Sequence, residues 1–378
     1  MPDTLTIIGA SARAAAWSAW RAGYEVRAGD LFADLDLADR CHARAVADYP
    51  RGLAEIVRGP QAGEWMYTGA LENHPALVEE WSQVRTLLGN AAEVLRRVRD
   101  PLAVAAALTA AGLPCPAATR GVPPPGSGVW LHKPLHSAGG AHVDYWHASS
   151  RAPHGVRAGC YIQEFIEGDS AAGLYLAAGG TARLLGVTRQ LMGGASTRGS
   201  RFGYCGSVGP LPLSRAANSS WTHIGDVLAG QFNLTGLFGV DAIVNSRGIW
   251  PVEVNPRYTA SAELFDWAHG ISTVGLHVAA CRTGQPAAPE IPAARRLHGK
   301  RIVFAEAPIV VQRDLRTTLS DSEMLSRDWP VLADIPTPGT RIDAGAPIVT
   351  VFAEGETQQQ VLERLRLLDA RVAECAGS

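Results

Sequence analysis

The chain has 378 residues, which exceeds the size at which one hydrophobic core keeps growing, so two or three domains are expected. Hydrophobic residues make up 47% and charged residues 19%, which excludes an intrinsically disordered chain. The formal net charge is −2 and the cations are spread along the chain, so nothing favours nucleic acid or an anionic membrane as a partner.

The spacing of the cysteines and the lengths of the apolar runs indicate the cellular compartment to expect. Six cysteines lie far apart without a CxxC pair, which indicates neither a zinc site nor a disulfide framework. The opening residues, MPDTLTIIGASARAAA, lack the pattern of a signal peptide. No stretch approaches the roughly 20 apolar residues that span a bilayer. A cytoplasmic protein with reduced thiols is expected.

The first predicted elements are a β-strand at 4–8, a turn at Gly9, an amphipathic helix over about 11–22 and a second strand. This βαβ opening carries one glycine where a dinucleotide-binding fingerprint needs three, so it does not favour hydride transfer. The acidic run GDLFADLDLADR follows, and we interpret it as a solvated loop with a helix N-cap in preference to a metal site. Its aspartates are Asp30, Asp34, Asp36 and Asp39.

Helical periodicity then covers 76–98, and a further helix begins with Asp100 as N-cap and Pro101 as its first residue. Strand-like segments follow at 129–133, 143–147, 160–166, 173–177 and 182–190. A helix is predicted over 217–232, and a closing amphipathic helix over 357–374.

The stretch LFGVDAIVNSRGIWPVEVNPRYTASAE, residues 237–263, predicts a β-hairpin because two alternating runs flank a break at NSRG. With the turn at 246–248, the numbers of paired residues sum to about 494, which places Asp241 opposite Glu253. Because side chains alternate between the faces of a strand, Glu253 and Asn255 lie on one side.

Two facing carboxylates repel each other unless a cation lies between them. An adjacent asparagine oxygen completes a hard-oxygen ligand set that suits Mg²⁺, which is usually held by one or two carboxylates plus substrate phosphates. Arg257, two residues beyond Asn255, presents a fixed fork to a carboxylate or phosphoryl oxygen. A surface hairpin with cross-strand charges explains any one of these residues, whereas the four together favour a magnesium site.

The stretch WLHKPLHSAGGAHV, residues 130–143, contains one of only two lysines among the 34 lysines and arginines. Lys133 ends a strand and precedes a small-residue loop whose N–H groups can close over phosphates, with the ammonium as a point charge. Further on, an apolar strand runs into QEFIEG. Its extended backbone offers a carbonyl and an N–H two residues apart, which matches an adenine edge. An ordinary glycine turn and an ordinary strand end are the alternatives.

In this order, the stretches HKPLHSAGGAHV, YIQEFIEGDS and GVDAIV…WPVEVNPRYTASAE resemble the ATP-grasp superfamily. The last is similar to the acidic-residue, ExN, R pattern of biotin carboxylase and its relatives. The resemblance implies a mixed α/β (α+β) fold of three domains. These are a Rossmann-like pre-ATP-grasp domain at 1–99, an ATP-grasp domain at 100–285 and a small α+β closing domain at 286–378. The linker composition of 284–296 agrees with the second boundary.

The resemblance also implies roles for particular residues. Lys133 contacts the ATP phosphates, and Arg257 orients the acyl or carboxy phosphate. The implied Mg²⁺ ligands, with Mn²⁺ as an alternative metal, are Asp241, Glu253 and Asn255. The implied ATP contacts on the covering loop, the adenine strand and the ribose are Ser137, Ala138, Gly139, Gly140, Gln163, Glu164, Phe165, Ile166 and Asp169. Many relatives have a second ATP-contacting lysine where this chain has Arg99, so either Arg99 substitutes for it or that contact is absent.

The implied function is an ATP-dependent ligase that activates a carboxylate as an acyl phosphate and joins it to an amine. It extends to glutamate ligation in the synthesis of a methanofuran-type or pterin-type one-carbon cofactor. Candidate substrate residues, with surface arginines and a core turn as the alternatives, are Arg198, Arg201, Glu72 and Asn73. The other hypotheses are a carboxylase that works through carboxyphosphate and a nucleotide-binding regulatory protein without turnover. The expected partners are small-molecule carboxylates and amines, and a homodimer is left open.

Overall fold

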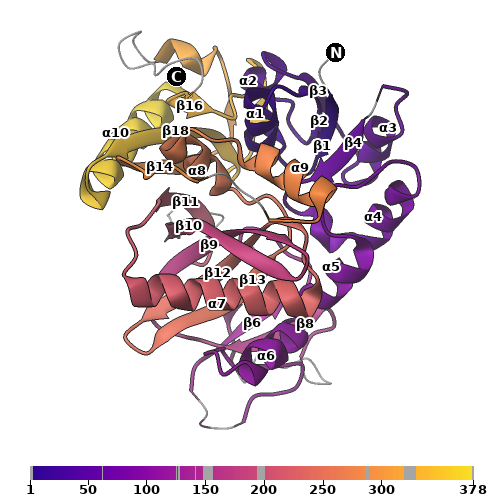
Figure 1. Cartoon of the computed structure of the whole chain (residues 1–378). Coiled ribbons are helices and arrows are strands. Elements are labelled where there is room, and N and C mark those ends of the chain that lie inside the picture. The colour runs from indigo at the N-terminus through magenta and orange to yellow at the C-terminus, as the bar shows by residue number, and fades with distance from the viewer. Residues whose placement is uncertain are drawn as a thin grey trace.

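A computed structural model of the chain describes residues 3–376 except 62, 125, 127, 141, 148–155, 194–200, 287–289 and 319–328. Most of its strands form two four-stranded sheets and one eight-stranded sheet, and helices pack around these sheets (Figure 1). Among the described helices, none combines the length and the hydropathy needed to cross a bilayer.

The N-terminal sheet is parallel and has the strand order β3-β2-β1-β4. Its strands are β1 (Thr4–Ile8), β2 (Glu25–Asp30), β3 (His42–Ala45) and β4 (Glu64–Tyr67). The helices around it are α1 (Arg13–Arg21), α2 (Leu35–Ala38), α3 (Ala54–Val57) and α4 (Pro75–Ser82). The βαβ opening is confirmed, and Gly9 is required at its turn because a Cβ there would lie 2.0 Å from Oγ1 of Thr68.

The interpretation of the acidic run as a solvated loop is wrong. Asp30, Asp34 and Asp36 are buried, each at most 6% exposed. The Asp30 carboxylate accepts hydrogen bonds from the N–H groups of Ala12, Phe32 and Ala33. Asp36 accepts from the N–H groups of residues 334 and 335, near the other end of the chain. Short-range composition does not reveal these partners, because 298 and 299 residues separate Asp36 from them.

The single helix predicted over 76–98 is also wrong, because the chain forms two helices there. They are α4 and α5 (Ala92–Val98). Between them the backbone runs beside β4, where Trp65 donates to the carbonyl of Thr86 at 3.0 Å and Leu88 donates to the carbonyl of Trp65 at 2.7 Å. Gly89 follows with φ of +136°, which an α-helix does not allow. Pairing with a distant strand therefore overrides the local helical pattern.

The second four-stranded sheet is antiparallel and has the order β5-β8-β6-β7. Its strands are β5 (Ala118–Thr119), β6 (Trp130–Pro134), β7 (Asp144–Tyr145) and β8 (Cys160–Glu164). Helix α6 (Pro101–Ala110) precedes it, and the N-cap prediction is confirmed because Asp100 accepts from the N–H of Leu102 at 3.0 Å.

The eight-stranded sheet is antiparallel throughout, with the order β13-β12-β9-β10-β11-β14-β18-β16. Its strands are β9 (Asp169–Ala178), β10 (Thr181–Met192), β11 (Tyr204–Gly209), β12 (Gly236–Asn245), β13 (Gly248–Asn255), β14 (Leu297–Phe304), β16 (Leu332–Ala333) and β18 (Pro347–Gly355). The strands β15 (Ile309–Val310) and β17 (Arg341–Ile342) form a separate pair. Because β11 pairs with β14, the large sheet runs across the boundary expected at 285 and 286.

Helices cover both faces of this sheet (Figure 1). Alternate residues of β9 show the division, since Tyr175 packs with Trp221 of α7 (Arg215–Phe232) and Leu176 packs in the core of α9 (Thr273–Thr283). Helix α8 (Ala262–His269) follows the hairpin of β12 and β13, and α10 (Gln358–Ala376) packs on β14 and β18.

A buried charge cluster joins the N-terminal helix α1 to the central and C-terminal parts. Nη1 of Arg13 donates to Oε2 of Glu263 at 2.6 Å, and Nε of Arg13 donates to Oδ1 of Asp334 at 2.9 Å. Lys300 on β14 donates to Glu263 as well, and to the carbonyl of Ala260 at 2.9 Å. The second lysine of the chain therefore has a structural partner in the segment that follows the hairpin.

Candidate active site

The hairpin of β12 and β13 has the predicted register. Asp241 pairs with Glu253 and Gly239 pairs with Asn255, so the two numbers of each pair sum to 494. A bulge after Asp241 then shifts the pairing, and Ala242 lies opposite Pro251. The prediction that the two carboxylates face each other is confirmed.

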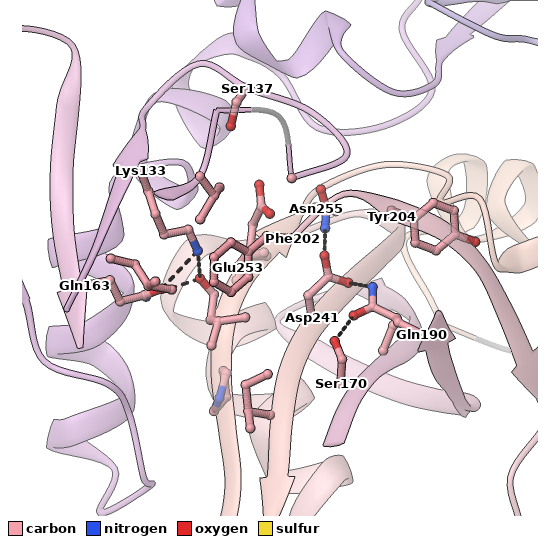
Figure 2. Close-up of a pocket in the computed structure, with 18 of the residues that line it drawn as sticks. Lys133, Ser137, Gln163, Ser170, Gln190, Phe202, Tyr204, Asp241, Glu253 and Asn255 are labelled. Carbon is pink, nitrogen blue, oxygen red and sulfur yellow. Dashed lines mark hydrogen bonds between the residues drawn. The ribbon is translucent and has the colours of Figure 1, made fainter. Parts of the chain in front are cut away.

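A cavity of about 430 Å³ lies between this hairpin and the sheet that contains β6 and β8. This volume is within the range of small-molecule sites. Asp241, Glu253 and Asn255 line the cavity, and Lys133 lines it from the opposite side (Figure 2). Arg257 also lines the cavity. Residues that are distant in sequence therefore converge on one space.

A chain of hydrogen bonds fixes the carboxylate of Asp241. Nε2 of Gln190 donates to its Oδ1 at 2.9 Å, and Nδ2 of Asn255 donates to its Oδ2 at 3.1 Å. The hydroxyl of Ser170 donates to Oε1 of Gln190 at 2.8 Å (Figure 2). Sequence reasoning missed Ser170 and Gln190, because only the neighbouring order of β12, β9 and β10 brings them to this side chain.

Arg99 is the counterion of Glu253. Its Nη1 donates to Oε1 of Glu253 at 2.6 Å and to the carbonyl of Val254 at 3.3 Å. Burial raises the pKa of the Glu253 carboxyl, but the charges of Arg99 and Lys133 outweigh this and hold that pKa below its usual value. For Asp241, burial together with the negative charge of Glu253 raises the carboxyl pKa to about 7.

Arg257 is held by Glu72. Nε and Nη2 of Arg257 donate to Oε1 of Glu72 at 3.1 and 2.8 Å. Nη2 also donates to Oδ1 of Asn255 at 3.0 Å, and Nη1 donates to the carbonyl of Tyr258 at 3.2 Å. The Glu72 side chain is 1% exposed. The structure thus brings a substrate candidate from the N-terminal part against the arginine of the hairpin.

Lys133 lies on β6 and points into the cavity (Figure 2). Its ammonium donates to Oε1 of Gln163 at 2.9 Å and to the carbonyl of Val252 at 3.5 Å. The pairing of β6 with β8, where Lys133 lies opposite Tyr161, fixes the position of Lys133 on the sheet. Neither hydrogen-bond partner carries a charge, so the ammonium can still attract an anion.

The glycine-rich loop after Lys133 is held at two points. The carbonyl of Ser137 accepts from Nδ2 of Asn73 at 3.2 Å, and the carbonyl of Gly139 accepts from the N–H of Tyr204 at 3.0 Å. Ser137, Gly139 and Gly140 line the cavity, whereas Ala138 is exposed outside it. The loop therefore covers the cavity and contacts both the N-terminal part and β11.

The predicted adenine strand also lines the cavity, with Gln163, Glu164, Phe165 and Ile166. The N–H groups of Glu164 and Phe165 donate hydrogen bonds to the carbonyls of residues 117 and 129, respectively. Apolar side chains that line the cavity include Val98, Val104, Leu131, Phe165, Ile166 and Ile243.

Some of the predicted ribose and substrate residues line the cavity and others do not. The Asp169 side chain is 78% exposed, does not line the cavity and lies 3.5 Å from Arg189, so the structure does not bring it to the other predicted residues. Arg201 lines the cavity with its guanidinium 5.7 Å from the ring centre of Tyr145. Arg198 lies outside the described residues.

The donors at the hairpin fit a divalent cation. Within the described ranges, no group of three or more histidine, cysteine, aspartate or glutamate side chains has an arrangement that could hold a metal ion. The hairpin instead offers two carboxylates and one amide oxygen, which suits an ion that takes its remaining ligands from water and phosphate. Burial and the neighbouring Glu253 charge keep the pKa of Asp241 raised although the charges of Arg257 and Lys133 lower it, so a further cation between the two carboxylates would be favourable.

The family model described as ATP-grasp domain matches residues 98–261. This part of the chain is an ATP-grasp domain. An uncharacterized protein of Methanocaldococcus jannaschii is 26% identical over 151 residues, which are 40% of this chain and 34% of that relative. The matched region thus spans about a third of the relative's length. The resemblance of the motifs to the ATP-grasp superfamily is confirmed.

Similarity to solved structures extends to nearly the whole chain. An L-amino acid ligase from Bacillus licheniformis has a TM-score of 0.72 at 14% identity, with 98% of this chain and 97% of that chain covered. The biotin carboxylase domain of 2-oxoglutarate carboxylase from Hydrogenobacter thermophilus, in complex with MgADP, ADP and bicarbonate, has a TM-score of 0.72 at 12% identity, with 97% and 89% covered. A phosphoribosylglycinamide synthetase from Anaerococcus prevotii has a TM-score of 0.70 at 13% identity, with 98% of both chains covered. These similarities confirm the expected fold class.

Proposed function

We propose that the protein is an ATP-dependent ligase that activates a carboxylate as an acyl phosphate and joins it to an amine. The observation that carries the proposal is the convergence of Asp241, Glu253 and Asn255 with Lys133 on one cavity of an ATP-grasp domain. The L-amino acid ligase with the same fold supports the amine as second substrate.

In the proposed site, Asp241, Glu253 and Asn255 hold Mg²⁺, which would neutralise charge on the ATP phosphates when bound. Lys133 binds the phosphate oxygens with an ammonium whose hydrogen-bond acceptors among the described residues, Gln163 and the carbonyl of Val252, are neutral. The strand at 163–166 receives adenine, and the loop at 137–140 excludes water from the cavity.

Arg257 positions the group that receives the phosphoryl. The Glu72 carboxylate fixes the orientation of its guanidinium at the wall of the cavity before the substrate arrives. The substrate carboxylate attacks the γ-phosphate, ADP leaves, and the amine then displaces phosphate from the acyl phosphate.

The test is ADP release with pooled carboxylic acids and amines, glutamate included. We expect Glu253→Gln to fold and to release ADP at least about a hundredfold more slowly, because the cation loses a charged ligand. Glu306→Gln is the matched control, since Glu306 is exposed and lies outside the cavity. Equal turnover by the Glu253→Gln variant and the wild type would contradict the proposed metal site.

A carboxylase acting through carboxyphosphate is the second candidate, favoured by the fold of the 2-oxoglutarate carboxylase domain. It predicts that bicarbonate stimulates ADP release without any amine. Stimulation by an acid and an amine together, with no response to bicarbonate, supports the ligase.

A further inference from the structure

Arg99 occupies the charge position that the proposed metal would take beside Glu253. The two side chains are joined at 2.6 Å, and they are 11% and 32% exposed. The positive charge of a guanidinium at this distance from the carboxylate compensates it in the absence of any metal.

Lys133 and Arg257 also act on Glu253 through their charges, but their hydrogen bonds go elsewhere. Lys133 donates to Gln163 and to the carbonyl of Val252 rather than to Glu253. Arg257 is engaged by Glu72. Among the described residues, Arg99 is thus the side chain that forms an ion pair with Glu253.

One carboxylate cannot bind a guanidinium and a divalent cation equally well, because the two positive charges repel each other across it. We infer that Arg99 is a counterion that is exchanged: it neutralises Glu253 in the nucleotide-free protein and gives up this carboxylate when the metal and nucleotide bind. This inference rests on the metal site of the proposed function.

The exchange would also remove a hydrogen bond from the glycine-rich loop. Nη2 of Arg99 donates to Oδ1 of Asn73 at 3.2 Å and to the carbonyl of Ser137 at 3.4 Å. Asn73 donates to that same carbonyl at 3.2 Å, so the loop keeps one partner when the guanidinium moves. Arg99 lines the cavity together with Lys133, so the released charge remains beside the space that the phosphates would fill.

The inference predicts that removal of Arg99 strengthens the binding of a bare metal ion. We would titrate Mn²⁺ without nucleotide by electron paramagnetic resonance, using the wild type, Arg99→Met and Arg99→Gln. The expected dissociation constant is about tenfold lower in both variants, since Mn²⁺ no longer competes with a charged hydrogen bond. Arg99→Gln retains an amide that can donate to Ser137, so it decides the result if Arg99→Met does not fold.

Arg201→Met is the matched control, because it removes the same charge from the same cavity without touching an ion pair of Glu253. It should change Mn²⁺ affinity by less than about twofold. Equal or weaker Mn²⁺ binding in the folded Arg99 variants would overturn the exchange. Asp241→Asn tests the metal site separately: its loss of Mn²⁺ binding supports the site, and unchanged binding would overturn the site and the exchange with it.

Discussion

Substitutions at Gly139 and Gly140 distinguish the effect of backbone strain from the effect of a steric clash. Their φ angles are +63° and +75°, so both substitutions to alanine carry similar backbone strain. A Cβ at Gly140 would lie 1.9 Å from the carbonyl oxygen of Phe202, whereas a Cβ at Gly139 meets nothing within 4 Å. Only Gly140 therefore lets the loop pack against the segment before β11.

We predict that Gly140→Ala raises the KM for ATP by about tenfold or more, because the loop no longer reaches its covering position. Gly139→Ala serves as the control for strain and should change this KM by about twofold or less. Steady-state kinetics with a saturating carboxylate and amine measure the difference. Equal effects of the two substitutions would show that contact with Phe202 does not hold the loop.

The buried carboxyl of Asp34 makes the folding stability depend on pH. Burial, with the negative charges of Asp334 and Asp36, raises the pKa of its carboxyl to about 8, whereas the unfolded carboxyl titrates near 3.8. Between these values the folded chain holds a proton that the unfolded chain has lost. The stability contributed by this group therefore falls as the pH rises from about 4 to 8, and it is constant above 8.

Asp34→Asn should remove this dependence. We expect the variant to melt about 5 °C higher than the wild type at pH 9, with the gain shrinking toward pH 5. Asp39→Asn, which changes an exposed carboxylate in the same run, is the control. A gain from Asp34→Asn that does not vary across this pH range would contradict the raised pKa. Calorimetric melting from pH 5 to 9 provides the measurement.

At the scale of elements, β9 and β10 support the hairpin that carries the proposed metal ligands. We predict that Gln190→Leu weakens binding of the magnesium–nucleotide complex by about tenfold, because Asp241 loses a donor that fixes its orientation. Ser170→Ala removes only the outer bond and should cost about threefold or less. Isothermal titration calorimetry with MgADP measures the dissociation constant of each variant. A larger effect of Ser170→Ala would mean that the chain of hydrogen bonds does not end on Asp241.

The hairpin could be predicted from the sequence because its two strands are adjacent and a short turn fixes their register. The pairing of Asp241 with Glu253 was predicted correctly for this reason. The partners of these residues could not be predicted, since Gln190 and Arg99 reach them through pairings that are distant in sequence. The same reason explains the buried Asp36 and the helix that ends at Ser82, where contacts with remote segments override local composition.

At the scale of the whole molecule, the buried charge cluster of Arg13, Glu263, Lys300 and Asp334 joins the three parts of the chain. Lys300 and Glu263 are 5% and 7% exposed in their side chains. Without Lys300, Glu263 keeps Arg13 as its partner, but the cluster holds an excess of buried negative charge, which costs about 3 kcal/mol or more.

We therefore predict that Lys300→Met lowers the urea midpoint strongly, by an amount equivalent to about 3 kcal/mol or more. Arg301→Met is the control on the same strand, because its pair with Asp369 is partly exposed and should contribute about 1 kcal/mol or less. Equal urea midpoints for the two variants would show that the cluster does not stabilise the assembly of the three parts.

The central claim is that Asp241, Glu253 and Asn255 bind one divalent cation that ATP shares. The most direct measurement is a crystal structure with Mn²⁺ and a non-hydrolysable ATP analogue, in which anomalous scattering locates the metal. We predict a single strong peak between the side chains of Asp241 and Glu253, with the phosphates of the analogue on its other side and Arg99 turned away from Glu253. A nucleotide bound outside this cavity, or a metal peak away from both carboxylates, would contradict the claim.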